Sequence, residues 1–108
     1  MNIEELRDYC FTKDNVEEGF PFGETTLVFK RNEKIFFLLT LDTLPIQFNV
    51  KCNPEKAIEF RETYDCVKPG YHMNKKHWNT VILDGTLNWN QITEMIDHSY
   101  ELVVKGKK

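Results

Sequence analysis

The chain has 108 residues and a formal charge of −3, with 14 basic residues against 17 acidic ones. Its composition, 41% hydrophobic and 29% charged, is that of an ordinary globular domain and excludes disordered and fibrous chains. The length suits one hydrophobic core, so we expect residues 1–108 to form a single domain and the protein to be a monomer. The longest uninterrupted apolar run, residues 35–39, is far shorter than the roughly 18 residues of a membrane helix, so we expect no membrane association.

The N-terminus and the cysteines favour a cytoplasmic protein. Glu4 and Glu5 stand where a secretory signal would carry basic residues. The three cysteines, Cys10, Cys52 and Cys66, are an odd number at wide spacing, which suits reduced thiols better than a disulfide framework.

The first half of the chain predicts one helix followed by three strands. The helix is expected over residues 3–12, with Asn2 and Glu5 as its capping box. Residues 13–24 contain Gly19, Pro21 and Gly23 and predict a loop that lays Phe20 and Phe22 onto the core. Strands are expected over residues 25–30, 34–40 and 45–51, and the last of these alternates between apolar and polar residues as a half-covered antiparallel strand does.

The second half predicts a helix, two strands and a final helix. The pair Asn53 and Pro54 is typical of a helix start. Strand-rich stretches follow at residues 66–72 and 77–84, and Asn88 with Gln91 caps a helix that runs to residue 105. The expected order is α-β-β-β-α-β-β-α. Strands in runs with helices on one face predict an α+β two-layer domain.

Several chemistries lack their residues. The five glycines never have the spacing of a phosphate-binding loop, and the single serine, Ser99, falls inside the last predicted helix rather than on a strained elbow. His72 and His77 are five residues apart, which places them on opposite faces of a strand, and no Cys-x-x-Cys motif accompanies them. We therefore expect no metal site and no cofactor.

Two enzymatic possibilities remain as weaker alternatives. Cys66 precedes two histidines and could form a catalytic pair with one of them, although a free cysteine is more often a small buried apolar residue. His72 and His77 titrate near neutrality and could act as bases. Because no nucleophile or orienting carboxylate accompanies them in the sequence, we expect a protein without enzymatic activity.

Positive charge is concentrated in one segment. Residues 67–83 contain three lysines and no acidic residue, whereas residues 1–24 contain seven acidic residues and two basic ones. Lysines meet phosphates and aromatic rings stack on bases, so this mixture favours a nucleic-acid interface. The alternative is that the rings are core residues and the lysines keep a hairpin soluble. The candidate binding residues are Lys30, Lys51, Lys68, Tyr71, His72, Asn74, Lys75, Lys76, His77 and Trp78.

The same segment resembles the MmcQ/YjbR family. The resemblance lies in KPGYHMNKKHWNTV at residues 68–81, followed by LDG at 83–85 and SYELV at 99–103. It extends upstream through FPFG at 20–23, TLVFK at 26–30 and NVKCNPE at 49–55, and so covers nearly the whole chain. The resemblance implies a CyaY-like, frataxin-like α+β fold and the function of a "double wing" DNA-binding protein.

Two functions from different classes follow. In the first, Lys75 and Lys76 at a hairpin tip contact DNA phosphates, and about four such contacts predict weak binding with a log–log salt slope near −3.6. In the second, the chain is a non-enzymatic adaptor or a small anionic-ligand binder whose acidic N-terminal surface, with Glu4, Glu5 and Asp8, meets a protein partner. These acids resemble, at fold level only, the ridge that frataxin-like proteins use with iron, so metal handling is a lesser alternative.

Overall fold

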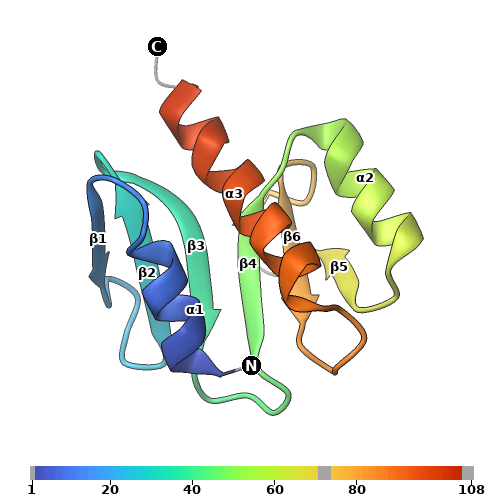
Figure 1. Ribbon diagram of the computed structural model, residues 1–108, viewed down its shortest axis with the longest axis horizontal. Coiled ribbons are helices and arrows are strands. Elements are labelled where there is room, and N and C mark those ends of the chain that lie inside the picture. Colours follow the sequence, from blue (N-terminus) through green and yellow to red (C-terminus); the bar gives the residue numbers. More distant parts are fainter. Residues whose placement is uncertain (1, 71–73, 106–108) are drawn as a thin grey trace.

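The three helices form where capping residues and apolar periodicity predict them. The computed structural model describes residues 2–70 and 74–105 (Figure 1). Helix α1 (Ile3–Cys10) opens with the expected capping box, in which the Glu5 N–H donates to Asn2 Oδ1 at 2.8 Å. Helix α2 (Pro54–Thr63) has proline in its first turn and Asn53 as its cap. Helix α3 (Trp89–Lys105) begins with reciprocal hydrogen bonds between Asn88 and Gln91.

Six strands form one antiparallel sheet in the order β1-β2-β3-β4-β6-β5. They are β1 (Val16–Gly19), β2 (Thr26–Arg31), β3 (Lys34–Thr40), β4 (Gln47–Lys51), β5 (Val67–Pro69) and β6 (Trp78–Ile82). All three helices lie on the same side of the sheet, with α3 crossing its middle (Figure 1). The expected α+β architecture, with helices on one face of an antiparallel sheet, is therefore confirmed.

The hydrophobic core lies between the helices and the sheet. Phe29, Phe37 and Phe48 stand on three neighbouring strands, fully buried, and their ring centroids are 5.5 and 5.1 Å apart in sequence order. Ile92 and Ile96 of α3 are fully buried as well. The alternation predicted for residues 45–51 is confirmed over 47–51, because Phe48 and Val50 are buried while Gln47, Asn49 and Lys51 are partly exposed.

The prediction for residues 13–24 was wrong in two respects. The segment contains β1, whose four residues pair with β2 along the edge of the sheet. Phe20 and Phe22 do not pack onto the core; their exposed fractions are 50% and 65%. The core beneath this edge is already filled by rings such as that of Phe29, and the turn in which the Gly23 N–H donates to the Phe20 carbonyl leaves the two side chains at the surface.

Candidate nucleic-acid interface

The antiparallel topology gathers the basic residues of the sheet at one end. Strands β2 to β6 contain five basic residues and no acidic residue. Strands β2, β4 and β5 finish at the end where β3 and β6 begin, which is the upper end of the sheet in Figure 1. This upper end carries Lys30, Arg31, Lys34 and Lys51, and Lys68 lies lower, level with Asn49 at the midpoint of β4. Glu33, in the turn between β2 and β3, and Glu17 of β1 lie at the same end, so basic residues are in excess there although the whole chain is acidic.

The strand register places most of these lysines on the face of the sheet away from the helices, called the outer face below. Val50 is buried toward the helices, so its neighbour Lys51 points the other way, opposite Trp78 in β6. Two residues further along β6, Thr80 pairs with Lys68 of β5. Lys51, Lys68 and Trp78 thus share the outer face of three neighbouring strands.

Lys30 shares the outer face but stands apart from the other lysines. Its neighbour Arg31 donates from Nε to the Tyr100 hydroxyl of α3 at 3.0 Å, so Arg31 faces the helices and Lys30 faces away from them. Lys30 lies on β2, three strand positions from β6, or about 14 Å at the usual spacing. It pairs across the sheet with Glu17 of β1, which offsets part of its charge. Lys30 belongs to the margin of the candidate interface.

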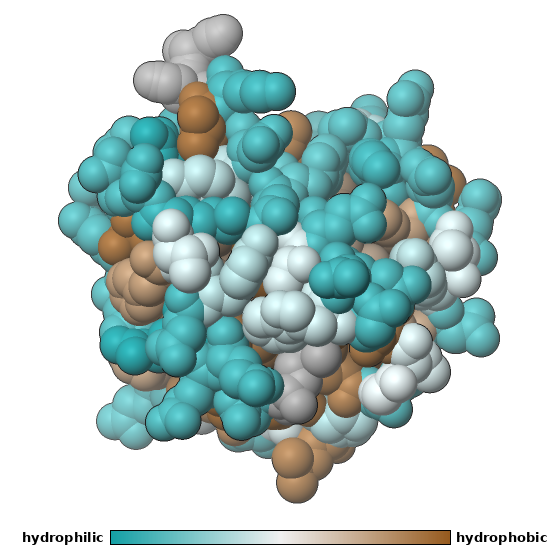
Figure 2. Space-filling view, in the orientation of Figure 1, coloured by the Kyte–Doolittle hydropathy of each residue, from teal (hydrophilic) through white to brown (hydrophobic). Residues whose placement is uncertain are grey.

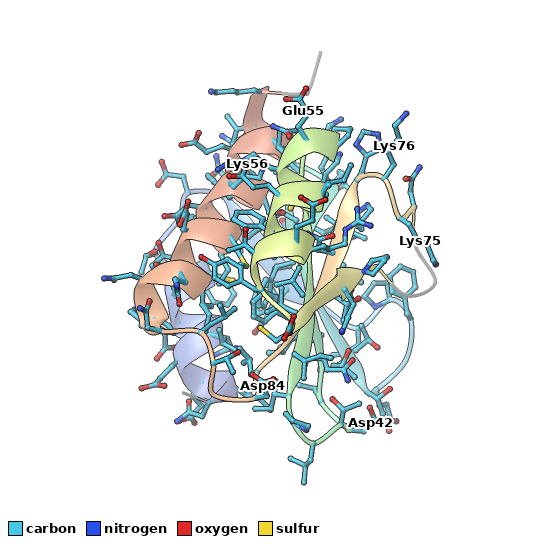
Figure 3. The ribbon with its side chains drawn as sticks, turned by 90° about the vertical axis from the view of Figure 1, so that its right-hand side faces the viewer. Asp42, Glu55, Lys56, Lys75, Lys76 and Asp84 are labelled. Atoms are coloured by element: carbon cyan, nitrogen blue, oxygen red, sulfur yellow. The ribbon has the colours of Figure 1, made fainter. Side chains whose placement is uncertain are left out.

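A tight turn presents two more lysines between β5 and β6. The Asn74 carbonyl accepts hydrogen bonds from the N–H groups of His77 at 3.2 Å and Trp78 at 3.0 Å. The Asn74 side chain accepts from the Lys76 N–H at 2.8 Å. Lys75 and Lys76 are consequently exposed in the turn that precedes β6 (Figure 3). Asn74, a candidate binding residue, uses its side-chain oxygen to shape this turn.

Helix α2 anchors the hairpin through Arg61, which the sequence analysis did not single out. The Arg61 guanidinium donates to the Lys75 carbonyl at 2.9 Å and to the Ala57 carbonyl in its own helix at 3.2 Å. Lys75 itself donates from Nζ to the Gly70 carbonyl at 3.3 Å, across the base of the turn. The backbone that carries the two lysines is therefore held against α2. No sequence pattern predicts this contact, because in the sequence Arg61 is one more charged residue of a polar helix.

Ser99 positions Lys51. The ladder between β2 and β3 shifts register after Phe29, and the pairing of β3 with β4 ends at Phe37 and Val50. Ser99 in α3 bridges the gap beyond that pair: its hydroxyl accepts from the Lys51 N–H at 2.9 Å and donates to the Phe36 carbonyl. The serine is fully buried, which fits its place on the apolar stripe between Ile96 and Val103. Its position on this apolar stripe is the sequence feature that indicates a structural serine rather than a catalytic one.

The structure describes some of the remaining candidate residues and omits others. His77 and Trp78 are half-buried at the start of β6, and the His77 carbonyl accepts from the Cys52 N–H at 2.7 Å. Tyr71 and His72 lie outside the described residues. Asn79, next to Trp78, is buried and donates to the Ala57 carbonyl at 3.2 Å, which ties β6 to α2.

The cysteine thiols and the Ser99 hydroxyl are buried. All three cysteines are buried, as the apolar interpretation of Cys66 predicted. Burial raises the pKa of the Cys10 thiol to about 12 and that of Cys52 to about 11, so both are protonated at neutral pH. Among residues 2–70 and 74–105, no three His, Cys, Asp or Glu side chains stand together where they could hold a metal ion. None of the helices described there is long and apolar enough to span a membrane.

The acidic N-terminal surface is partly neutralised by the chain's own basic residues. Arg7 of α1 forms a two-pronged ion pair with Glu18 of β1, with contacts of 2.7 and 2.5 Å. This pair lowers the pKa of the Glu18 carboxyl, chiefly through the hydrogen bond. Glu5 is engaged in the capping box of α1.

The sequence and the fold have recognisable relatives. The model of the family described as YjbR matches residues 11–102. The chain belongs to the YjbR family. It is 40% identical over 92 residues to YbdF of Escherichia coli O157:H7, a match that covers 84% of this chain and 75% of that protein. It is 33% identical over 104 residues to YjbR of Escherichia coli K12, covering 96% and 88% of the two chains. Both relatives are described as uncharacterized proteins, so neither name adds a function.

Solved structures share the fold. A crystal structure of a Deinococcus radiodurans protein, described by the domain DUF419, superposes with a TM-score of 0.92 at 37% identity and covers 96% of this chain and 79% of that one. A crystal structure of a Pseudomonas syringae protein gives a TM-score of 0.80 at 28% identity and covers 94% and 98% of the two chains. The arrangement of strands and helices described above therefore recurs in experimental structures.

Proposed function

We propose that this YjbR-family chain, acting as a single domain, binds DNA weakly through the upper end of its outer face. The observation that carries the proposal is that strands β2 to β6 hold five basic residues and no acidic one, four of them at one end of the sheet. Lysines that are gathered in this way release counterions from a polyanion despite the net charge of −3.

In this proposal, the lysines have two roles. Lys75 and Lys76 meet phosphates first, because both are exposed in the turn between β5 and β6; the ammonium of Lys75 exchanges the Gly70 carbonyl for a phosphate oxygen. Lys51 and Lys68 extend the phosphate path across the outer face. Trp78 lies between these lysines and offers a ring to sugar or base. With about four phosphate contacts the log–log salt slope is near −3.6, so binding is weak at physiological salt.

A titration of labelled duplex DNA tests the proposal. Fluorescence anisotropy at low salt should give saturable binding with the stated slope. Lys75→Ala/Lys76→Ala should weaken binding about tenfold and flatten the slope by about two. The control is Lys56→Ala/Lys105→Ala, which removes the same charge from helices α2 and α3 and should change affinity much less. Equal losses in both double variants, or no binding at about 100 μM protein, would rule out this interface.

We also propose that the activity is binding alone, without a catalytic step. The thiols are buried, and the Ser99 hydroxyl is buried and engaged in two hydrogen bonds, which supports this view. In the adaptor alternative the same upper end binds a small anionic ligand, and affinity should not depend on the length of the DNA. A long duplex and a short oligonucleotide of a few phosphates should then bind alike, whereas a DNA interface favours the longer one.

A further inference from the structure

Three connections at the lower end of the sheet form one continuous edge. They are residues 20–25, between β1 and β2, residues 41–46, between β3 and β4, and residues 83–88, which lead into α3. The Leu41 N–H donates to the Thr25 carbonyl at 2.8 Å, and the Leu83 N–H donates to the Ile46 carbonyl at 2.9 Å. The connections are therefore fixed to one another by backbone hydrogen bonds.

This lower edge exposes large apolar side chains. Phe20 and Phe22 are 50% and 65% exposed, and Leu44 is 95% exposed. An apolar side chain projects beneath the lower end in Figure 2, where the rest of the visible face is mostly hydrophilic. Taking roughly 200 Å² for each fully exposed side chain, the three offer on the order of 400 Å² to solvent. Apolar patches of about this size are the largest on typical monomers and are often functional.

Carboxylates lie at the same end of the sheet as these apolar residues. Each of the connections 20–25, 41–46, 64–66 and 83–88 contains one acidic residue and no basic residue. They are Glu24, Asp42, Asp65 and Asp84, all exposed. Figure 3 shows Asp42 and Asp84 near the lower end of the molecule, below Lys75 and Lys76. An acidic rim repels nucleic acid, so this edge suits a different occupant from the proposed DNA interface.

We infer that the lower edge is a docking surface for a partner protein segment that carries apolar side chains flanked by lysine or arginine. Phe20, Phe22 and Leu44 would bury against the apolar residues of the segment, and the carboxylates would pair with its cations. The surface lies at the other end of the sheet from the DNA interface and does not depend on that function. A chain with both surfaces can hold a basic protein segment while its upper end remains open.

An NMR titration with synthetic peptides tests the inference. The probe is a peptide of about 14 residues made of leucine, phenylalanine and lysine. The control peptide has glutamate in place of lysine. The lysine peptide should shift amide signals of residues 20–25, 41–46 and 83–86, and the glutamate peptide should bind about tenfold more weakly. Phe22→Ser/Leu44→Ser should also weaken the lysine peptide about tenfold.

Two variants and one further measurement make the outcome decisive. Ile58→Ser removes an apolar side chain that is 52% exposed on α2 and should leave peptide affinity unchanged. Lys75→Ala/Lys76→Ala should leave it unchanged too, while Phe22→Ser/Leu44→Ser should keep its melting temperature and its DNA binding. Equal binding of the two peptides, or shifts confined to α1 or the upper end, would overturn the inference. So would sedimentation showing a dimer that Phe22→Ser/Leu44→Ser dissolves, because the occupant would then be a second copy.

Discussion

At the scale of single residues, Gly70 directly follows β5 and lies tightly against Trp78 of β6. A Cβ at this position would lie 2.8 Å from Trp78 Cβ and 3.0 Å from the Trp78 carbonyl oxygen. The same oxygen accepts the Gly70 N–H at 2.9 Å, so the strands cannot separate without losing that bond. Gly70→Ala should therefore lower the free energy of unfolding by about 1–3 kcal/mol in urea denaturation. Gly19→Ala, with nothing within 4 Å of its new Cβ, is the control and should stay within about 0.5 kcal/mol of the wild type.

His98 gives the fold a dependence on pH. Its Nε2 accepts the N–H of Asn53, the cap of α2, at 3.3 Å, and only the neutral ring can do so. Burial, and next the charge of Lys56, lower the pKa of His98 below its ordinary value. The unfolded chain then binds the proton more readily than the folded one. The contribution of His98 to the stability of the fold is therefore complete above about pH 6.5 and is lost as the pH falls through the pKa of His98 in the folded protein.

The comparison of melting curves at about pH 7.5 and 5.5 measures this contribution. The wild-type melting temperature should fall further between the two than that of His98→Gln, whose amide oxygen can accept the Asn53 N–H at either pH. An equal fall in both proteins would mean that other groups carry the dependence.

At the scale of elements, the hairpin of β2 and β3 has a turn that its sequence does not favour. Asn32 and Glu33 have φ values of 52° and 70°, and the flanking residues Arg31 and Lys34 pair with each other, as in a two-residue turn with both central residues left-handed. Asparagine tolerates this conformation, but glutamate is strained there. Glu33→Gly should stabilise the protein by up to about 1 kcal/mol in thermal or urea unfolding, because the relief of backbone strain exceeds the entropy cost of glycine. Glu33→Ala removes the carboxylate but keeps the Cβ; if it stabilised as much as Glu33→Gly, charge rather than backbone strain would be the cause.

Elements with strong local signals could be predicted from the sequence, and those that depend on partners could not. The caps at Asn2, Asn53 and Asn88 act within four residues, so their helices begin where the sequence predicts. Strand β1 has only four residues, two of them glutamate, and exists because β2 offers it an edge. The surface position of Phe20 and Phe22 likewise depends on how other residues fill the core, which alternation and composition do not report.

The candidate interface was predictable to the same degree. The lysines could be chosen from local charge and from the outward positions of a strand, but the face and end that they share follow from the register between strands. The contribution of Ser99 depends on the gap in the ladder beside Phe36, and that of Arg61 on a carbonyl fourteen residues away. Both are supports of the lysines rather than members of a motif, so no spacing in the sequence marks them.

At the scale of the whole molecule, the fold separates charge that is mixed along the chain. The basic ends of the strands face upward, and the four lower connections each hold one carboxylate. A five-residue strand such as β4 separates the two ends by about 15 Å. The Debye length is about 8 Å at physiological salt and about 30 Å at 0.01 M. The charge at one end is therefore screened from the other end at physiological salt but not at 0.01 M.

Neutralising lower carboxylates should therefore affect DNA binding only at low salt. Asp42→Asn/Asp84→Asn should raise affinity about threefold near 0.01 M salt and leave it unchanged near 0.15 M, as measured by anisotropy. Asparagine at position 84 keeps an oxygen that can accept from the Thr86 N–H and hydroxyl, which reach Asp84 at 3.1 and 2.7 Å, so the connection should stay folded. If the gain were equal at both salt concentrations, the carboxylates would lie within reach of the DNA. The proposed interface at the upper end would then be misplaced, because a site there is more than a Debye length from these residues at physiological salt.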